Sequence, residues 1–235
     1  MQILIIGCEY AGKTTLAQGI TRWHEEMMGP IAYPYWHDHF VLPNVGQGPD
    51  SQAENEAIIE LLKTVPSLVE KFQRFQFLYH LQPHLIRGDD FFLVNWYYAD
   101  AVYGPLYYGD FKSSWEPGHQ WLAQFVEHEV KALVPEMLLT LVKASPDVIR
   151  ERMHRNPLPN CPIKESDIEI VLDRFDEHFT NSLFDAKITI DTTDLTVEQT
   201  LKDFVNKAEP FLRCVDRQRI LNHQVLQQTK SADTP

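Results

Sequence analysis

Cysteine is scarce in this chain of 235 residues. Cys8, Cys161 and Cys214 are far apart in the sequence, and none of them belongs to a C-x-x-C pair or to a metal-binding spacing. An odd number of widely separated cysteines argues against a disulfide framework and against a structural zinc site. The composition favours a reducing compartment instead.

Long apolar runs are also missing. No segment offers the roughly 20 consecutive apolar residues that a membrane-spanning helix needs. The N-terminus lacks a basic region followed by a signal core, and its apolar residues 3–6 are better explained as a first strand. We therefore expect no membrane partner and, by default, a cytoplasmic location.

Positive charge is in short supply. The chain has 21 lysines and arginines against 33 aspartates and glutamates, which gives a formal net charge of −12. This balance disfavours a nucleic-acid polymer as the partner, although a small phosphate compound needs only local positive charge. The guanine motif N-K-x-D and a D-x-x-G motif after a strand are absent as well. Their absence disfavours a signalling GTPase.

A phosphate-binding loop is present near the N-terminus. The segment GCEYAGKTT at residues 7–15 fits G-x-x-x-x-G-K-[ST], between the apolar run 3–6 and an expected helix at 14–28. Gly7 and Gly12 lack a Cβ, so the backbone can turn tightly and approach a ligand. The loop N–H groups and the helix N-terminus then face phosphate oxygens. The motif predicts a nucleoside-triphosphate site.

The residue types within the loop predict which cofactors it binds. Lys13 is placed to reach the β- and γ-phosphates, and the Thr14 hydroxyl is placed to bind Mg²⁺. Cys8 is explained equally well as a small buried residue. We predict ATP and Mg²⁺ as cofactors, with Lys13 catalytic and Thr14 a metal ligand. The nucleotide is expected to contact Gly7, Glu9, Ala11, Gly12, Lys13, Thr14 and Thr15.

Apolar strands alternate with helices along the rest of the chain, which predicts an α/β fold with a parallel five-stranded sheet and helices on both faces. One domain is expected over 1–208, with a lid at about 150–165, and a C-terminal helix with a frayed tail over 209–235. Capping boxes are expected at Ser166 and Thr196, and Ser145 is expected to cap a helix that Pro157 ends. The expected strands are 3–6, 31–36, 91–94, 137–142 and 187–190, and the expected helices include 96–103, 119–133 and 166–181.

Ligands of parallel sheets bind beyond the carboxyl ends of the strands, so the residues there are candidates. Asp38 follows the second expected strand and is our candidate for the acid that orients the acceptor. A loop acid that caps a backbone turn is the alternative. His37 and His39 are poor partners for Asp38 in a metal site, because adjacent residues of a strand point in opposite directions.

Arginines follow the fourth expected strand. Arg152 and Arg155 lie three residues apart on one helix face, whereas Arg150 points elsewhere. An arginine-bearing lid would place positive charge around a transferred phosphoryl group, with Arg155 the first choice and Arg152 the second. The alternative is a solvated helix face on which Glu151 pairs with Arg155.

Several of these segments resemble one enzyme family. The loop GCEYAGKTT looks like the phosphate loop of thymidylate kinases, which often reads G-x-E-G-A-G-K-T-T. Residues 72–80 and 88–103 are similar to a helix–strand–helix unit of thymidylate and deoxynucleoside kinases, and residues 145–153 resemble the start of their lid helix. Residues 173–176 and 190–193 resemble two further stretches of thymidylate kinases. The resemblance spans about 1–208 and is most specific at the phosphate loop.

The resemblance implies transfer of the γ-phosphate of ATP to a nucleoside monophosphate (dTMP-like) or to a deoxynucleoside. The family carries an acid–arginine pair after its third strand, where this chain reads Asn95-Trp96, and a helix arginine where it has His80. Asp100 is the expected substitute for the acid. The family's base-binding glutamine corresponds to Gln73 or Gln76, and aromatic residues such as Tyr97 would sandwich the base.

Three alternatives stay open at this point. The aromatic residues are equally explained as core. Because of the departures at Asn95-Trp96 and His80, the acceptor is alternatively another small metabolite, or the chain is a nucleotide-binding protein without transfer activity. The resemblance is also compatible with a homodimer formed through helices beside the sheet.

Overall fold

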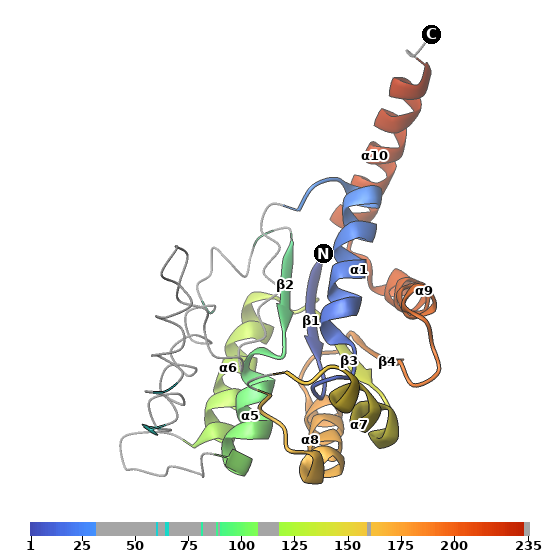
Figure 1. The fold of residues 1–235 in the computed structure, drawn as a ribbon. Coiled ribbons are helices and arrows are strands. Elements are labelled where there is room, and N and C mark those ends of the chain that lie inside the picture. Colours follow the sequence, from blue (N-terminus) through green and yellow to red (C-terminus); the bar gives the residue numbers. More distant parts are fainter. Residues whose placement is uncertain are drawn as a thin grey trace.

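The computed structural model describes residues 1–31, 60, 64–65, 81, 88, 90–107, 118–158 and 161–232. Within these residues four parallel strands form one sheet in the order β2-β1-β3-β4 (Figure 1). The predicted α/β fold with a parallel sheet is confirmed, with four strands in the described part rather than five. The predicted strand at 31–36 lies, apart from Ile31, outside the described residues. The strands are β1 (Gln2–Ile6), β2 (Phe91–Val94), β3 (Leu138–Lys143) and β4 (Lys187–Asp191).

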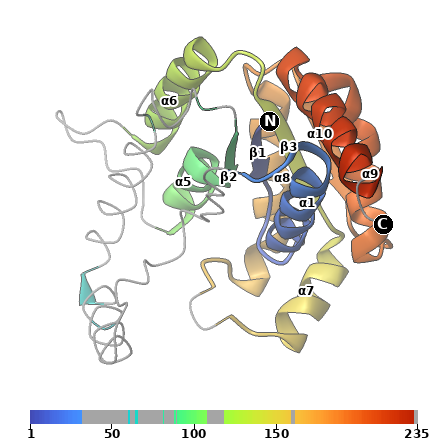
Figure 2. The same ribbon diagram turned by 90° about the horizontal axis from the view of Figure 1, so that it is seen from above.

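The sheet is covered on both faces, because successive side chains of a strand point to opposite sides. In β1, Ile3 and Ile5 belong to one hydrophobic core, and Leu4 and Ile6 belong to the other. Figure 2 shows the helices that cover these two faces lying on opposite sides of the strands. The first core includes α1 (Lys13–Met28) and α9 (Val197–Ala208), and the second includes α5 (Trp96–Tyr107), α6 (His119–Leu133) and α8 (Ile168–Asn181).

Several helix ends follow the signals in the sequence. Helix α7 (Pro146–Arg155) begins after Ser145, whose side chain accepts a hydrogen bond from the Val148 N–H at 3.4 Å. Helix α9 begins with the predicted capping box, in which the Thr196 and Gln199 side chains each accept a bond from the other residue's backbone. Local chemistry therefore sets these boundaries.

Two boundaries were predicted wrongly. Ser166 does not open a helix, because a 3₁₀ turn η1 (Glu165–Asp167) precedes α8 and the Ser166 hydroxyl donates to Asp167. Helix α5 continues to Tyr107 rather than ending at Tyr103. The Tyr107 hydroxyl donates to Asp167 Oδ2 at 3.0 Å and accepts the Lys164 N–H at 3.2 Å. These tertiary contacts hold a last turn that Pro105 would otherwise weaken.

The last helix, α10 (Cys214–Ala232), follows a 3₁₀ turn η2 (Glu209–Phe211) and extends away from the sheet (Figure 1). Buried charges hold the first turn of this helix, which contains Asp216. The Met1 amine lies 2.8 Å from Asp216 and 2.6 Å from Asp90. Burial alone would raise the pKa of Asp90, but hydrogen bonds from His24, Arg219 and the amine hold it well below its usual range. Within the described ranges, no helix combines the length and the apolar character needed to cross a membrane.

Candidate functional site

The phosphate loop connects β1 to α1 through two glycines in the left-handed region of backbone space. Gly7 has φ 147° and Gly12 has φ 97°. A Cβ on Gly7 would lie 2.2 Å from the Val142 carbonyl oxygen of β3, so the loop runs against the neighbouring strand. Gly12 is the N-cap of α1, and the Ala11 N–H donates to the Cys8 carbonyl oxygen at 3.2 Å. The sequence therefore folds here as the motif predicted.

Lys13 lies across the mouth of this loop. Its side chain is 3 % exposed. The Nζ donates to the Cys8 carbonyl oxygen at 2.9 Å and lies 3.3 Å from Glu9 Oε1. The carbonyl and the carboxylate hold this buried ammonium group in a fixed position beside the loop, where phosphate binding requires a cation.

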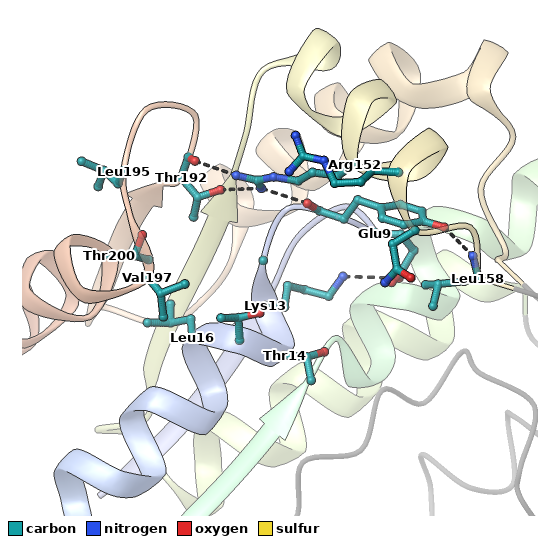
Figure 3. Close-up of a pocket in the computed structure, with 15 residues that line it drawn as sticks. Glu9, Lys13, Thr14, Leu16, Arg152, Leu158, Thr192, Leu195, Val197 and Thr200 are labelled. Carbon is teal, nitrogen blue, oxygen red and sulfur yellow. Dashed lines mark hydrogen bonds and ion pairs between the residues drawn. The ribbon is translucent and has the colours of Figure 1, made fainter.

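A cavity of ≈ 430 Å³ opens over the loop and the first turn of α1 (Figure 3). Its size is within the usual range for small-molecule sites. The lining comes from the phosphate loop, from α7 and the segment after it, and from the end of β4 with the start of α9. The lining residues are Glu9, Tyr10, Gly12, Lys13, Thr14, Thr15, Leu16, Arg152, Arg155, Asn156, Leu158, Thr192, Leu195, Val197 and Thr200.

Arg152 connects the three parts of this wall. Its Nη1 donates to the Tyr10 carbonyl oxygen and to Thr192 Oγ1, both at 3.0 Å, and its Nη2 donates to the Thr192 carbonyl oxygen at 2.8 Å. Thr192 Oγ1 in turn donates to the Ala11 carbonyl oxygen at 2.8 Å. Burial lowers the pKa of the Arg152 guanidinium. A half-buried arginine thus lies against the phosphate loop.

Tyr10 makes a second connection between the loop and the segment after α7. Its backbone has φ 62°, a conformation that non-glycine residues rarely adopt. The Tyr10 hydroxyl accepts the Leu158 N–H at 2.9 Å. Leu158 belongs to the predicted lid, so this part of the lid is attached to the phosphate loop in this structure.

Arg155 lines the same cavity in a more exposed position. Its side chain is 71 % exposed and pairs with Glu151, as the alternative interpretation of this helix proposed. Arg150 pairs with Asp147 and Glu169 outside the cavity lining. The structure therefore places Arg152, our second choice, in closer contact with the loop than Arg155, our first.

We expect Arg152→Ala to lower the rate of ADP formation from ATP by about 10²-fold or more, because it removes a fixed positive charge beside the phosphate loop. Arg155→Ala is the matched control. It makes the same charge change on the same helix but removes a solvent-exposed pair, so it should change the rate by less than about threefold. Steady-state assays of both variants measure the difference. If Arg155→Ala lowers the rate more than Arg152→Ala does, Arg155 is the more important arginine, as the sequence suggested.

Asn95 occupies the position after β2 and serves the phosphate loop. Its Oδ1 accepts the Gly7 N–H at 3.1 Å, and its Nδ2 donates to Glu9 Oε1 at 3.3 Å. Its φ of 59° is left-handed, which asparagine tolerates better than most residues. Sequence reasoning noted that Asn95 directly follows a buried strand, but it interpreted the residue as a departure from the family's acid–arginine pair and did not predict this contact with the loop.

Tyr97 and Asp100 lie apart from the phosphate cavity. Tyr97 is buried, stacks on Tyr98 with ring centroids 4.6 Å apart, and borders a separate cavity of ≈ 320 Å³ between α5, α6 and α8. Burial raises the pKa of its hydroxyl well above the usual value. Asp100 is buried, and its Oδ2 lies 2.9 Å from His119 Nδ1. Neither residue is in the lining of the phosphate cavity.

The remaining predicted residues are not placed. Asp38, Gln73 and Gln76 lie outside the described residues, as do His37, His39 and His80. In the part of the chain that the structure covers, no group of three or more histidine, cysteine, aspartate or glutamate side chains could hold a metal ion. Thr14, the predicted metal ligand, is exposed at the start of α1 and lines the cavity.

Comparisons with known proteins agree on the fold. No family model matches the chain, and no curated protein sequence matches it either. A structure of deoxyadenosine kinase from M. mycoides with bound dATP has 15 % identity and a TM-score of 0.54, covering 89 % of this chain and 100 % of that one. YorR protein from Bacillus subtilis, in complex with phosphorylated GDP, has 16 % identity and a TM-score of 0.52, covering 90 % and 99 %. The chain has the fold of the P-loop nucleoside kinases.

Proposed function

We propose that this protein transfers the γ-phosphoryl group of ATP to a small acceptor, a nucleoside or a nucleoside monophosphate. The observation that carries the proposal is the convergence of Lys13, the N-terminus of α1 and Arg152 on one cavity beside the phosphate loop. Phosphoryl transfer needs mainly positioning and positive charge around the phosphate oxygens, and these groups supply both.

Each group has a role in this proposal. The loop from Gly7 to Thr15 holds the triphosphate with its backbone N–H groups, and Lys13 contacts the β- and γ-phosphates. Arg152 adds charge from α7, and residues of about 150–165 act as a lid that excludes water. The neighbouring structures, which hold dATP and phosphorylated GDP, support a purine nucleotide as the ligand of this fold.

Magnesium fits the residues at the loop. Mg²⁺ is usually held by one or two protein groups together with substrate phosphates, rather than by a cage of protein ligands. The exposed Thr14 hydroxyl at the cavity is a suitable protein ligand of this kind. The ion would neutralise charge that develops on the phosphate oxygens.

The acceptor side of the site extends beyond the described residues. We keep Asp38 as a candidate for the acid near the acceptor, and Gln73 or Gln76 as candidates for contact with its base. Tyr97 and Asp100 would need to act indirectly, because both are buried away from the phosphate cavity.

A second candidate function is nucleotide binding without transfer. Asn95 favours it, because an amide stands directly after β2 and holds the phosphate loop rather than a substrate. A kinase for another small metabolite is a third candidate and differs only in the acceptor.

The test is ADP formation from Mg-ATP against a panel of nucleosides, nucleoside monophosphates and other phosphorylatable metabolites. We expect stimulation by a nucleoside or a nucleoside monophosphate. If a compound without a nucleobase stimulates ADP formation, the acceptor belongs to another chemical class. The assignments within the phosphate loop would still hold. Tight ATP binding with no stimulation by any acceptor would favour the non-catalytic candidate.

A further inference from the structure

A second cavity lies apart from the phosphate loop, among helices that share one face of the sheet. It measures ≈ 320 Å³ and is bordered by α5, α6 and α8 (Figure 1). Most of the side chains that line it are polar, and they include Gln124, Glu127, Arg174, His178 and Asn181. A gap in an apolar core would not gather such groups, so this cavity has the composition of a binding site.

One buried hydroxyl at this cavity has no hydrogen-bond partner among the described residues. It belongs to Tyr97, which is 1 % exposed and contributes to the cavity lining. The hydroxyl of Tyr98, the tyrosine stacked on it, donates to Glu127 Oε1 at 2.6 Å. A buried hydroxyl that lacks a partner costs free energy. A molecule bound in the cavity would remove this cost by forming the missing hydrogen bond.

A buried carboxylate lines the same cavity and uses only one of its oxygens. Glu127 is 9 % exposed, and its Oε1 accepts from the Tyr98 hydroxyl at 2.6 Å and from the Ser182 hydroxyl at 2.7 Å. The described residues give this carboxylate no ion pair and leave its Oε2 without a hydrogen bond. A buried charge of this kind is favourable only with a counter-ion, so the second oxygen is suited to a cation.

The other ionisable groups of the lining leave a net negative charge. Glu177 adds a second carboxylate, whereas Arg174 adds one positive charge and donates through Nη1 to the Val102 carbonyl oxygen at 3.0 Å. Burial lowers the pKa of the His178 imidazole, so this side chain is neutral at pH 7. Two carboxylates and one guanidinium favour a ligand with a single positive charge. Tyrosine rings in the lining add a surface that attracts organic cations.

We propose that this cavity binds a small amino alcohol and that the bound molecule is an effector of the phosphate loop. The ammonium group of the ligand faces Glu127, and its hydroxyl forms a hydrogen bond with the Tyr97 hydroxyl. An anion would meet the Glu127 carboxylate, and a polyamine would bring more positive charge than the lining neutralises. This inference does not depend on which acceptor the phosphate site uses.

Helix α5 connects the cavity to the phosphate loop. Tyr97 is the second residue of α5, and Asn95, which accepts the Gly7 N–H at 3.1 Å, stands two positions before it. Further along the same helix, Tyr103 donates to Glu9 Oε1 at 3.4 Å. A ligand that fixes the first turn of α5 should therefore hold both contacts with the loop and raise ATP affinity. By linkage, ATP must raise the affinity for the amino alcohol by the same factor.

The experiment titrates the full chain with choline and with ethanolamine, and follows the NMR signals of each probe. The matched neutral probe is 3,3-dimethylbutan-1-ol, which has the shape of choline without its charge. Four proteins are compared: the wild type, Glu127→Gln, Tyr97→Phe and Glu129→Gln. Glu127→Gln removes the charge and keeps an oxygen that accepts from Tyr98 and Ser182. Glu129 is exposed on the same helix and lies outside the cavity lining, so Glu129→Gln is the matched control.

We expect choline or ethanolamine to bind the wild type with a Kd of about 1 mM or tighter. Glu127→Gln should weaken binding by about tenfold or more, and Tyr97→Phe by about threefold to tenfold. Glu129→Gln should change it by less than about twofold. Without ligand, Tyr97→Phe should lower the melting temperature by no more than about 2 °C, because it removes a hydroxyl without a partner. A saturating amino alcohol should tighten calorimetric ATP binding by about fivefold.

Other results would overturn the inference in separate ways. If no probe binds, the cavity holds only water, and equal binding of 3,3-dimethylbutan-1-ol would remove the role of charge. Equal losses in Glu127→Gln and Glu129→Gln would place the ligand elsewhere, and a strongly destabilised Tyr97→Phe would mean that the hydroxyl is already bonded. Unchanged ATP affinity at saturating probe would overturn the effector role. These readouts need no turnover, so a failure of the proposed kinase activity is distinguishable from a failure of this site.

Discussion

Replacing Lys13 by alanine is expected to lower kcat for ADP formation by about 10³-fold or more. The Lys13 ammonium is 3 % exposed and is aimed across the loop at the Cys8 carbonyl and Glu9. Its removal would leave the Glu9 carboxylate facing the triphosphate without a compensating cation. ATP affinity should therefore also fall, by about 10-fold to 100-fold for the loss of a charge-assisted hydrogen bond.

The matched control for this variant is Lys207→Ala. Lys207 pairs with Asp203 on α9 and is 45 % exposed, so its removal changes the net charge equally at a distance from the loop. Its turnover should stay within about twofold of the wild type. If Lys13→Ala and Lys207→Ala behave alike in both turnover and calorimetric ATP affinity, the phosphate-loop assignment fails.

Replacing Gly7 by alanine is expected to destabilise the fold by about 3 kcal/mol or more. The new Cβ would lie 2.2 Å from the Val142 carbonyl oxygen, and the residue would keep a φ of 147°. Backbone atoms of a central strand cannot move aside as a flexible side chain can, so β1 and β3 would have to separate locally. Urea unfolding followed by circular dichroism measures the change in free energy of unfolding.

Gly29→Ala provides the control for backbone conformation alone. Gly29 has φ 89°, and a Cβ there would meet no atom within 4 Å. Its cost should be about 1–3 kcal/mol, because Gly29 also has a ψ of −179° and this backbone region is almost restricted to glycine. Equal losses for Gly7→Ala and Gly29→Ala would mean that the contact with Val142 does not restrict the loop.

The parts of the fold that sequence predicted well depend on local chemistry. The phosphate loop needs only a few residues in a fixed order, so Gly7, Gly12 and Lys13 could be assigned without knowing their neighbours. The cap of α9 likewise depends on Thr196 and Gln199 alone, three residues apart. Such features are encoded within one turn of the chain, which is why periodicity and spacing detect them.

The parts that sequence missed depend on contacts between distant segments. Spacing placed Arg152 and Arg155 on the same helix face, and we ranked Arg155 first because spacing does not show which arginine contacts the phosphate loop. The contacts of Arg152 with Tyr10 and Thr192 join residues more than a hundred positions apart and about forty positions apart. The extension of α5 to Tyr107 depends in the same way on Lys164 and Asp167. Tertiary contacts override local preference at such positions.

The aromatic residues show the same limit. Trp96, Tyr97 and Tyr103 at helical spacing suited either a base-binding pocket or a core, and the structure places all three in the buried core on one face of the sheet. Tyr103 nevertheless reaches Glu9 with its hydroxyl. Only the packing of α5 against the phosphate loop shows that one core residue also touches the site.

The order of the strands has a consequence for how the chain is made. Strand β1 lies in the interior of the sheet, but its partners β2 and β3 begin only at Phe91 and Leu138. At ribosomal rates of about 5–20 residues per second, β1 must wait on the order of ten seconds before β3 emerges. Among the described residues, β2 is the only partner strand that can cover one edge of β1 before β3 emerges, and the other edge stays open. Folding of this chain during synthesis should therefore depend on chaperones that bind the N-terminal segment early.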